Sequence, residues 1–357
     1  MRTAAAIPAG AAPGAVAGPW QEVLSWRWLC GGVLALAAAL LAGLAFGPAG
    51  IPPGALLGDL AGQLPLIRDG RQLSSLESAV LWELRAPRVV LGALVGATLA
   101  TAGGAYQAVF RNPLADPYLL GAAAGAGLGA TIAIVYVGVV PLPLAAFVGA
   151  TAAAGGAYLL GRSVGDGRDT ATLILAGVAM AAFLTAVQTM VLQQDTENVR
   201  AIYSWLLGRL STSGWREVLL VLPYAVFSIA VVLAHRRLLD VLRVGDEEAT
   251  GLGVRVGRVR LLVVGAATLG TAAAVAVSGL IGFVGIVVPH AVRLLAGSSY
   301  RIVLPLSMLF GAAFLVLADV IARTALSPAE LPIGVVTACI GAPFFVVVLR
   351  TGGRASA

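Results

Sequence analysis

Lysine is absent from this chain of 357 residues, so all 23 of its basic residues are arginines. The usual phosphate-binding loop needs a lysine that reaches the β- and γ-phosphates of a nucleotide. Imine catalysis needs a lysine amine as the nucleophile. The absence therefore excludes an ATP site of the usual kind on this chain, and it excludes Schiff-base chemistry.

Histidine and cysteine are also scarce, with two of each. His235 and His290 are too few to form a metal site of their own. Cys30 and Cys339 lie in apolar runs far apart in the sequence, and we expect them to be small core hydrophobes rather than a disulfide or a metal pair. We therefore expect no catalytic residue and no metal ligand. An intramembrane enzyme would need a convergent nucleophile–base or metal cluster, which this composition disfavours.

Charge is the third scarcity, since only 11% of the residues are charged, 59% are hydrophobic and the mean hydropathy is +0.95. A soluble protein cannot bury that much apolar surface, so the sequence predicts an all-α polytopic membrane protein. Its apolar runs predict about ten transmembrane helices, near Leu29–Phe46, Pro87–Gln107, Pro117–Gly138, Leu142–Gly161, Ala171–Leu192, Arg216–His235, Val259–Val277, Leu280–Ala296, Ile302–Arg323 and Leu331–Leu349.

The arginines orient these helices. With a cytoplasmic N-terminus, fifteen arginines lie inside and eight outside, and the positive-inside rule selects this arrangement. Both termini are then cytoplasmic, and the net charge of +6 reflects orientation in the cell (inner) membrane rather than binding of nucleic acid. Residues 1–19 are rich in Ala, Pro and Gly and are expected to be a disordered tail. Residues 20–350 are expected to form one transmembrane domain, and residues 351–357 a C-terminal tail.

The segment Gly245–Arg260 is the longest polar interruption in the second half of the chain. Its acidic start and basic end predict a short cytoplasmic helix pair with acids in the first turn and arginines near the last, which suits the helix dipole. We interpret it as a docking surface for a soluble partner. The alternative is a solvated loop that only satisfies the orientation rule.

Three further segments are unusual. Gly47–Leu84 is a long outer segment that is expected to lie over the mouth of the bundle, and Asn198–Ser211 predicts an interfacial helix that either gates or caps it. The inner loop around Asn112 is bracketed by prolines and precedes glycines at four-residue spacing, which predicts close helix contact.

Asp319 and Arg323 are one helical turn apart, either as a simple ion pair or with Arg323 turned outward to an acidic partner. Because the spans hold almost no acids at mid-depth, an ion-gradient-driven secondary transporter is disfavoured.

Three stretches carry a resemblance that runs in order from about Trp20 to Arg350: RAPRVVLGALVGATLATAGGAYQAVFRNPLADPYLLG, SGLIGFVGIVVPHAVR and ELPIGVVTACIGAPFF. They resemble the FecCD-type permeases, which are membrane subunits of ATP-binding-cassette (ABC) importers for ferric siderophores, haem and cobalamin. The resemblance implies ten helices per subunit and a homodimer or close heterodimer within the lipid bilayer. It also implies a cytoplasmic ABC ATPase dimer that binds ATP and Mg²⁺, and an external substrate-binding protein. This chain would bind no cofactor itself.

The resemblance also implies roles for individual residues. Coupling to the ATPase would fall to Asp246, Glu247, Glu248, Leu252, Gly253, Val254 and Arg258. Docking of the binding protein would fall to Arg85, Arg88 and Arg323, whose planar guanidinium groups suit bidentate carboxylate binding, although the first two could simply anchor a helix end. A cytoplasmic gate would fall to Asn112, Leu114, Thr170 and Ala171, where Ala171 departs from the expected hydroxyl residue. Glu330 and the prolines and glycines of the closing motif would be structural.

The function implied is therefore the membrane subunit of an ABC importer for a metal chelate. Ferric siderophore is the first candidate for the cargo, with haem and cobalamin close behind. An ion-gradient-driven secondary transporter is the alternative, and uptake that survives loss of the ATPase would favour it.

Overall fold

The computed structural model describes residues 24–47, 54, 58, 73–137, 140–164, 170–195, 197–210 and 214–352. The described residues contain helices and connecting turns and no strand. Seven helices are long and apolar enough to cross a membrane, and three shorter apolar helices bring the total to the ten that the sequence predicts. The expected N-terminal tail at 1–19, residues 353–357 of the expected C-terminal tail at 351–357, and most of the outer segment 47–84 lie outside the described residues. Residues 351 and 352, expected in the tail, are the last two of a helix.

The long helices are α1 (Trp26–Ala45), α3–η2–α4 (Ser75–Ala79, Val80–Arg85 and Ala86–Val109), α6 (Leu142–Val164), α7 (Thr170–Gln194), α9 (Arg216–Ala234), α12 (Val256–Ser278) and α14 (Tyr300–Thr324). The shorter apolar helices are α5 with η3 (Ala122–Ile132 and Ala133–Val137), α13 (Val284–Ala296) and α15 (Ile333–Gly352). Three small helices connect them: α8 (Val199–Leu206), α10 (Arg236–Leu242) and α11 (Asp246–Gly251).

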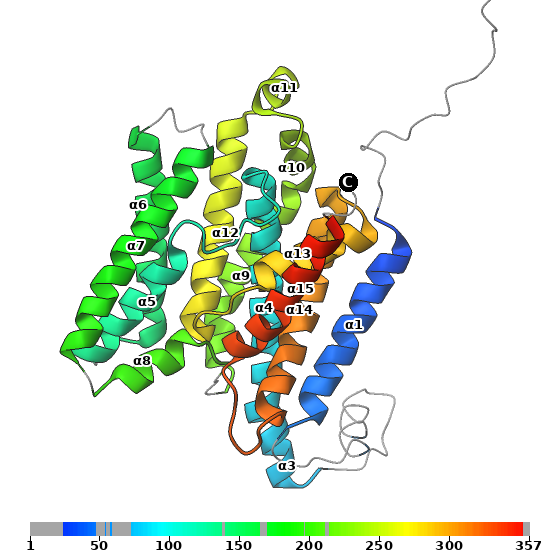
Figure 1. Cartoon of the computed structure of the whole chain (residues 1–357). Coiled ribbons are helices and arrows are strands. Elements are labelled where there is room, and N and C mark those ends of the chain that lie inside the picture. The colour runs from blue at the N-terminus through cyan, green and yellow to red at the C-terminus, as the bar shows by residue number, and fades with distance from the viewer. Residues whose placement is uncertain are drawn as a thin grey trace, which may run out of the picture.

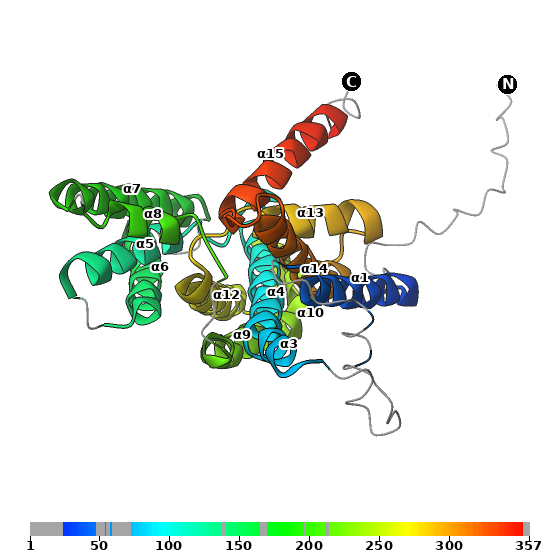
Figure 2. The ribbon, with the colours of Figure 1, turned by 90° about the horizontal axis from the view of Figure 1, so that it is seen from below.

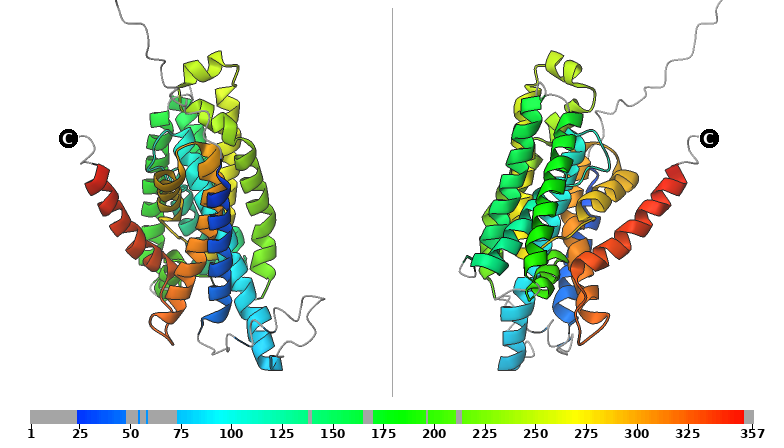
Figure 3. Two further views of the ribbon diagram at one scale, coloured as in Figure 1. Left: turned by 90° about the vertical axis from the view of Figure 1, so that its right-hand side faces the viewer. Right: turned by 60° about the vertical axis from the view of Figure 1, so that its left-hand side comes forward.

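Helix α4 forms the centre of the bundle. Figure 2 shows it surrounded by α9, α12, α13 and α14, and nearly all of its residues are buried. Small side chains allow this close packing: a Cβ at Gly103 would overlap the carbonyl of Gly285 in α13. Helices α5, α6 and α7 form a second group at one side, and α15 extends away from the bundle (Figure 3).

Helices α10 and α11 lie at one end of the molecule and α3 and α8 at the other (Figure 1). Helix α1 begins, and α15 ends, at the α11 end. The arginine distribution puts that end in the cytoplasm, so it is called the cytoplasmic end here, and the opposite end is called the outer end. The start of α1 and the end of α15 therefore lie at the same end of the bundle, which is consistent with the even number of spans predicted.

Several predicted boundaries are wrong. The second span was expected from Pro87, but the helix begins at Ser75 and continues through a π-helical turn. The third was expected from Pro117, but α5 starts at Ala122, because Gly121 adopts a left-handed backbone with φ +80° that ends the preceding turn. The predicted small-residue contact face is confirmed for Gly125 and Gly129, which pack against the backbone of α6.

The two cysteines are not core residues. Cys30 is half-buried on α1, and Cys339 is exposed on α15, so the expectation that both are small core hydrophobes is wrong for Cys339. The burial of Cys339 was predicted from the apolar run around it. In a membrane helix, however, apolar residues occur both on the face that packs against protein and on the face that contacts lipid.

Candidate functional site

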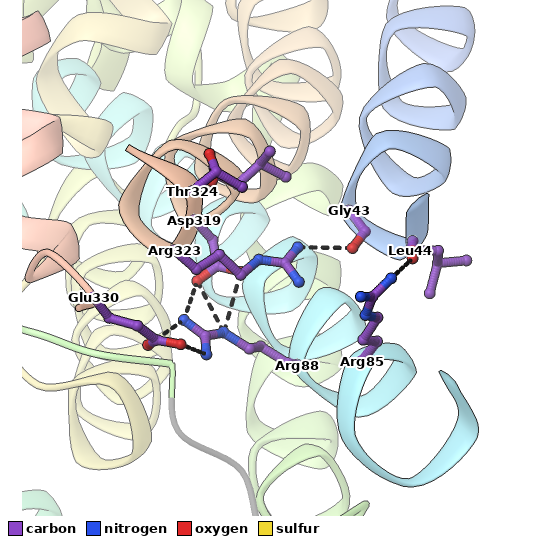
Figure 4. Close-up of polar contacts among 9 residues, drawn as sticks. Gly43, Leu44, Arg85, Arg88, Asp319, Arg323, Thr324 and Glu330 are labelled. Carbon is purple, nitrogen blue, oxygen red and sulfur yellow. Dashed lines mark hydrogen bonds and ion pairs between the residues drawn. The ribbon is translucent and has the colours of Figure 1, made fainter. Parts of the chain in front are cut away.

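The outer end holds a cluster of three arginines and two carboxylates, shown in Figure 4. Its members come from segments far apart in the sequence: Arg85 and Arg88 from η2 and α4, Asp319 and Arg323 from α14, and Glu330 from the linker before α15. The structure thus brings together the three arginines that the sequence analysis grouped as docking residues. We call this group the outer arginine cluster.

Arg88 is the centre of the outer arginine cluster. Its Nε donates to both oxygens of Asp319 at 3.0 and 3.2 Å, and its Nη2 donates to Asp319 Oδ1 at 2.8 Å. Its two terminal nitrogens also donate to the two oxygens of Glu330, each at 3.0 Å. A planar guanidinium can bind two carboxylates at once in this way because its donors point in fixed directions.

Arg323 is turned inward, so the expectation that it could face outward is wrong. It is 2% exposed, its Nε lies 3.2 Å from Asp319 Oδ2, and its Nη2 donates to Gly43 O at 2.7 Å. Arg85 is also buried, and its Nη1 donates to Leu44 O and Ala45 O at 2.8 and 3.1 Å. Both arginines therefore satisfy carbonyl groups in the last turn of α1, which has no intrahelical donors for them.

Charge in the outer arginine cluster is nearly balanced within the chain. Removing Asp319, which is 2% exposed and pairs with both Arg88 and Arg323, would leave two guanidinium groups in a poorly solvated place, which is strongly unfavourable. The sequence analysis singled out Asp319 and Arg323 as a pair, but it missed that Glu330 completes the cluster. No local pattern could show this, because Arg88 is separated from Glu330 by 242 positions.

At the cytoplasmic end, the predicted helix pair is a single short helix, α11, followed directly by the membrane helix α12. Gly253 lies between the two helices with a left-handed backbone, φ +81°, which prevents them from joining into one continuous helix. Arg258 and Arg260 therefore lie in the first turns of α12, so the expectation that the arginines stabilise the end of a coupling helix is wrong. The acids of the first turn of α11 are as predicted.

The remaining residues grouped for coupling divide by exposure. Leu252 is 68% exposed, and Glu247, Glu248, Gly253 and Arg258 are exposed as well. Val254 is half-buried and packs against the main core. Asp246 is half-buried and binds its own chain, pairing with Arg111 and, at 3.1 Å, with Arg260. The exposed part of α11 thus combines a large apolar side chain with carboxylates.

Arg111 connects α10 and α11 to the loop that follows α4. Its Nε donates to Leu242 O at 2.8 Å and its Nη2 donates to Asp246. Its backbone is left-handed, with φ +48°, which a residue with a side chain adopts only when its surroundings hold it. The sequence analysis counted Arg111 only for orientation, and this contact was missed.

A second set of contacts connects α10 to the turn before α14. The buried Asp240 accepts from Ser299 Oγ and Tyr300 N, both at 2.7 Å, and Arg243 donates to Ser298 O at 3.0 Å. Through these bonds and those of Arg111, the helices α10 and α11 contact the ends of three membrane helices, α4, α12 and α14.

The candidate gate residues Asn112 and Leu114 lie in the loop after α4, directly beside Arg111. Asn112 Oδ1 accepts from Leu114 N at 2.9 Å, which closes a tight turn, and the Leu114 side chain is 55% exposed. Farther along the loop, burial raises the pKa of Asp116 to about 6, partly offset by a hydrogen bond from Tyr118 N. The Tyr118 hydroxyl donates to Ile281 O at 3.0 Å, so the loop is also attached to the segment before α13.

The other two candidate gate residues, Thr170 and Ala171, open α7. Ala171 is exposed, and the side chain of Thr170 lies outside the described part of the structure. The loop meets α7 two turns farther on, where a Cβ at Gly177 would overlap the carbonyl of Leu119.

Within the described residues, no group of three or more His, Cys, Asp or Glu side chains is arranged to hold a metal ion. His290 packs its ring against Phe344 and Phe345 of α15. The charged groups that the structure brings together lie at the two ends of a helical bundle whose long helices are apolar enough to cross a membrane.

The chain matches the FecCD transport family over residues 34–351. It is 46% identical over 276 residues to a cobalamin import system permease protein of Halobacterium salinarum, covering 76% of this chain and 73% of the relative. It is 40% identical to an Fe(3+)-citrate import system permease protein of Bacillus subtilis, covering 78% and 83%. A metal-chelate type ABC transporter solved in an inward-facing conformation superposes with a TM-score of 0.79 at 30% identity, covering 91% of this chain and 99% of that one.

This chain belongs to the FecCD transport family. It is a multi-span permease of the ABC transporter class and resides in the inner membrane.

Proposed function

We propose that this chain is the membrane half of an importer that carries a metal chelate inward, with ATP hydrolysed on a separate cytoplasmic subunit. The observation that carries the proposal is the family match across residues 34–351, which includes both charged ends of the bundle. Ferric siderophore is the cargo proposed first, with haem and cobalamin as the alternatives. Relatives named for cobalamin and for ferric citrate support a metal chelate as the class.

The cytoplasmic partner is an ABC ATPase dimer, which holds ATP and Mg²⁺, while this chain binds no cofactor. The exposed surface of α11 supports this assignment. Leu252, which follows α11 directly and is 68% exposed, lies near the exposed residues Glu247 and Glu248, and together they have the mixed apolar and charged character of a protein contact.

The outer partner is a substrate-binding protein that docks at Arg85, Arg88 and Arg323, where its carboxylates reach Arg88 and the buried Arg85 and Arg323 contribute positive charge behind it. Their meeting in one cluster at the outer end supports this assignment, and Arg88 is the one with measurable exposure, at 17% of its side chain. A second copy of this chain is proposed to complete the path, and the open face of α15 supports that (Figure 3). Lipid surrounds the assembly.

Movement of the ATPase would be transmitted to the translocation path through the contacts of Asp246. When closure displaces α11, the ion pair of Asp246 with Arg111 moves the loop that carries Asn112 and Leu114, while Asp240 moves the start of α14. This would alternate access between the two sides by tilting rigid helices.

The test is cargo uptake into vesicles that contain the complete complex, with ferric siderophore, haem and cobalamin supplied in turn. Uptake of one chelate that requires ATP hydrolysis supports the proposal and identifies the cargo. Equal uptake with a non-hydrolysable ATP analogue would favour the ion-gradient-driven secondary transporter instead. A complex that hydrolyses ATP and moves none of the three chelates would overturn the cargo proposal.

Contact with the ATPase is tested by Leu252→Asp, which places a charge on the exposed face of α11. We expect the ATPase to dissociate from the detergent-purified complex at least tenfold more readily, because burying an unpaired carboxylate in an interface is costly. Leu326→Asp is the matched control, since Leu326 is 59% exposed at the outer end. Full co-purification of the ATPase with the Leu252 variant would locate the contact elsewhere.

A further inference from the structure

Four of the five N–H donors of the Arg88 guanidinium are engaged in this structure, which leaves a single N–H on Nη1. Nε and Nη2 bind Asp319, and Nη1 and Nη2 bind Glu330. A carboxylate that arrives from another protein can bind Arg88 in the same bidentate way only if one of these two leaves.

The two carboxylates differ in how easily they can leave. The Asp319 side chain is 2% exposed and also pairs with Arg323, so removing it would strand two arginines. The Glu330 side chain is 45% exposed, lies on the linker Ala325–Pro332, and hydrogen-bonds only to Arg88 within the described residues. Glu330 can turn into water at little cost, and Asp319 cannot.

We propose that Glu330 is an internal substitute for a carboxylate of the substrate-binding protein, and that docking displaces it from Arg88. The inference rests on the proposed docking at the outer arginine cluster. Displacing Glu330 leaves the outer arginine cluster with three arginines and one carboxylate, Asp319, which pairs with Arg88 and Arg323. Only an incoming carboxylate restores the balance, so the exchange selects an acidic partner and keeps the cluster paired when no partner is bound.

Displacement of Glu330 also changes the attachment of α15. Glu330 lies three residues before the start of α15, and this linker is otherwise fixed by Leu331 N donating to Ala322 O at 2.8 Å and Ile333 N donating to Gly208 O at 3.1 Å. Docking therefore breaks the connection between the linker and Arg88 of α4. The start of α15 is then held less firmly when a partner is bound than when none is.

The experiment measures the dissociation constant of the importer's purified substrate-binding protein for the permease–ATPase complex in lipid nanodiscs. Glu330→Gln replaces an ionic pair with a weaker neutral one, so we expect binding about five- to tenfold tighter than that of the unaltered complex. Glu83→Gln is the matched control, because Glu83 is an exposed carboxylate in η2 at the same end and makes no recorded contact with the cluster. It should change binding by less than about twofold.

A second variant separates the two proposals. Arg88→Ala should weaken binding at least tenfold, and unchanged binding would mean that the docking proposal itself fails. Weaker binding by Arg88→Ala together with unchanged or weaker binding by Glu330→Gln would overturn the role of Glu330 and leave docking intact.

A third measurement does not depend on the partner. Phenylglyoxal modifies accessible guanidinium groups, and peptide mass spectrometry can follow Arg88 separately. We expect Arg88 to be modified faster in Glu330→Gln than in Glu83→Gln, while the buried Arg85 and Arg323 stay slow in both. Equal rates at Arg88 in the two variants would show that Glu330 does not cover it.

Discussion

Among single residues, Asp116 has an environment that makes the stability of the protein depend on pH. It lies in the candidate gate loop, its carboxylate accepts one backbone hydrogen bond from Tyr118, and burial raises its pKa to about 6. A carboxyl group whose pKa is higher in the folded state binds protons more readily when folded, so ionising it opposes folding. The loop therefore carries a destabilising charge at neutral pH.

Asp116→Asn is expected to stabilise the protein at pH 7 by up to about 3 kcal/mol, since the pKa rises by about two units and each unit corresponds to about 1.4 kcal/mol. The unaltered protein loses stability as the pH rises from about 4 to about 6, so the difference between the two proteins should grow over that interval and remain constant above it. Thermal unfolding in detergent from pH 4 to pH 8 measures this. A difference that does not vary with pH would contradict it.

Among elements, the contacts of α11 matter most, because they connect the cytoplasmic surface to the loop after α4. Arg111 contacts both α10 and α11, and its left-handed backbone places Asn112 and Leu114 beside it. The unusual backbone at this position means that the loop keeps its shape only while α10 and α11 hold Arg111.

Arg111→Ala is expected to separate ATP hydrolysis from transport. The ATPase can still bind α11 and hydrolyse ATP, but the gate loop loses its connection, so cargo uptake should fall at least tenfold, which corresponds to about 1.4 kcal/mol of coupling. Both rates are measured in the same vesicles. Arg237→Ala, an exposed arginine of α10 without a recorded contact, is the control and should leave both rates unchanged. Parallel loss of hydrolysis and uptake in the Arg111 variant would indicate failed assembly instead.

Packing between elements gives a second prediction at this scale. A Cβ at Gly103 would overlap the Gly285 carbonyl, so Gly103→Ala should lower the unfolding free energy by about 1–3 kcal/mol as α4 and α13 move apart. Gly155→Ala on α6 meets no atom within 4 Å and should be neutral or stabilising by about 0.5–1 kcal/mol. Thermal unfolding of the two variants in the same detergent compares them directly, and similar effects would contradict the close contact.

At the scale of the whole molecule, α15 extends away from the rest of the bundle (Figure 3). Beside it lies a groove of about 700 Å³, lined by Leu207, Leu280, Phe283, Val335 and Cys339 among others. A second copy seated on this face would explain why a cysteine lies exposed in an apolar groove near the proposed path.

Cys339→Trp is expected to shift the purified permease from two copies towards one, because a large ring at the proposed interface prevents close approach. Leu34→Trp on the exposed face of α1, where Leu34 is 69% exposed, is the control and should keep two copies. Light scattering after gel filtration gives the mass of each. Two copies in both variants would place the second chain on another face.

The ten helices, the orientation and the position of α11 could be predicted from the sequence, because hydropathy and arginine distribution are local signals. The predicted helix starts at Pro87 and Pro117 were wrong, since a polar stretch can be helical, as at Ser75, and an apolar one can be a turn, as before Ala122. The inward turn of Arg323 could not be predicted, because it depends on Gly43 O, 280 residues earlier. The roles of the coupling, docking and gate residues remain predictions.

The capping of α1 by two arginines has a consequence for the order in which the protein is made. The last turn of α1 ends with carbonyl groups that need donors, and Arg85 supplies one 40 residues later in the chain. The donor for Gly43 O is Arg323, which leaves the ribosome only with the ninth of the ten membrane helices. The first helix to enter the membrane is therefore among the last to be completed, and until then one of its carbonyls must be satisfied by water.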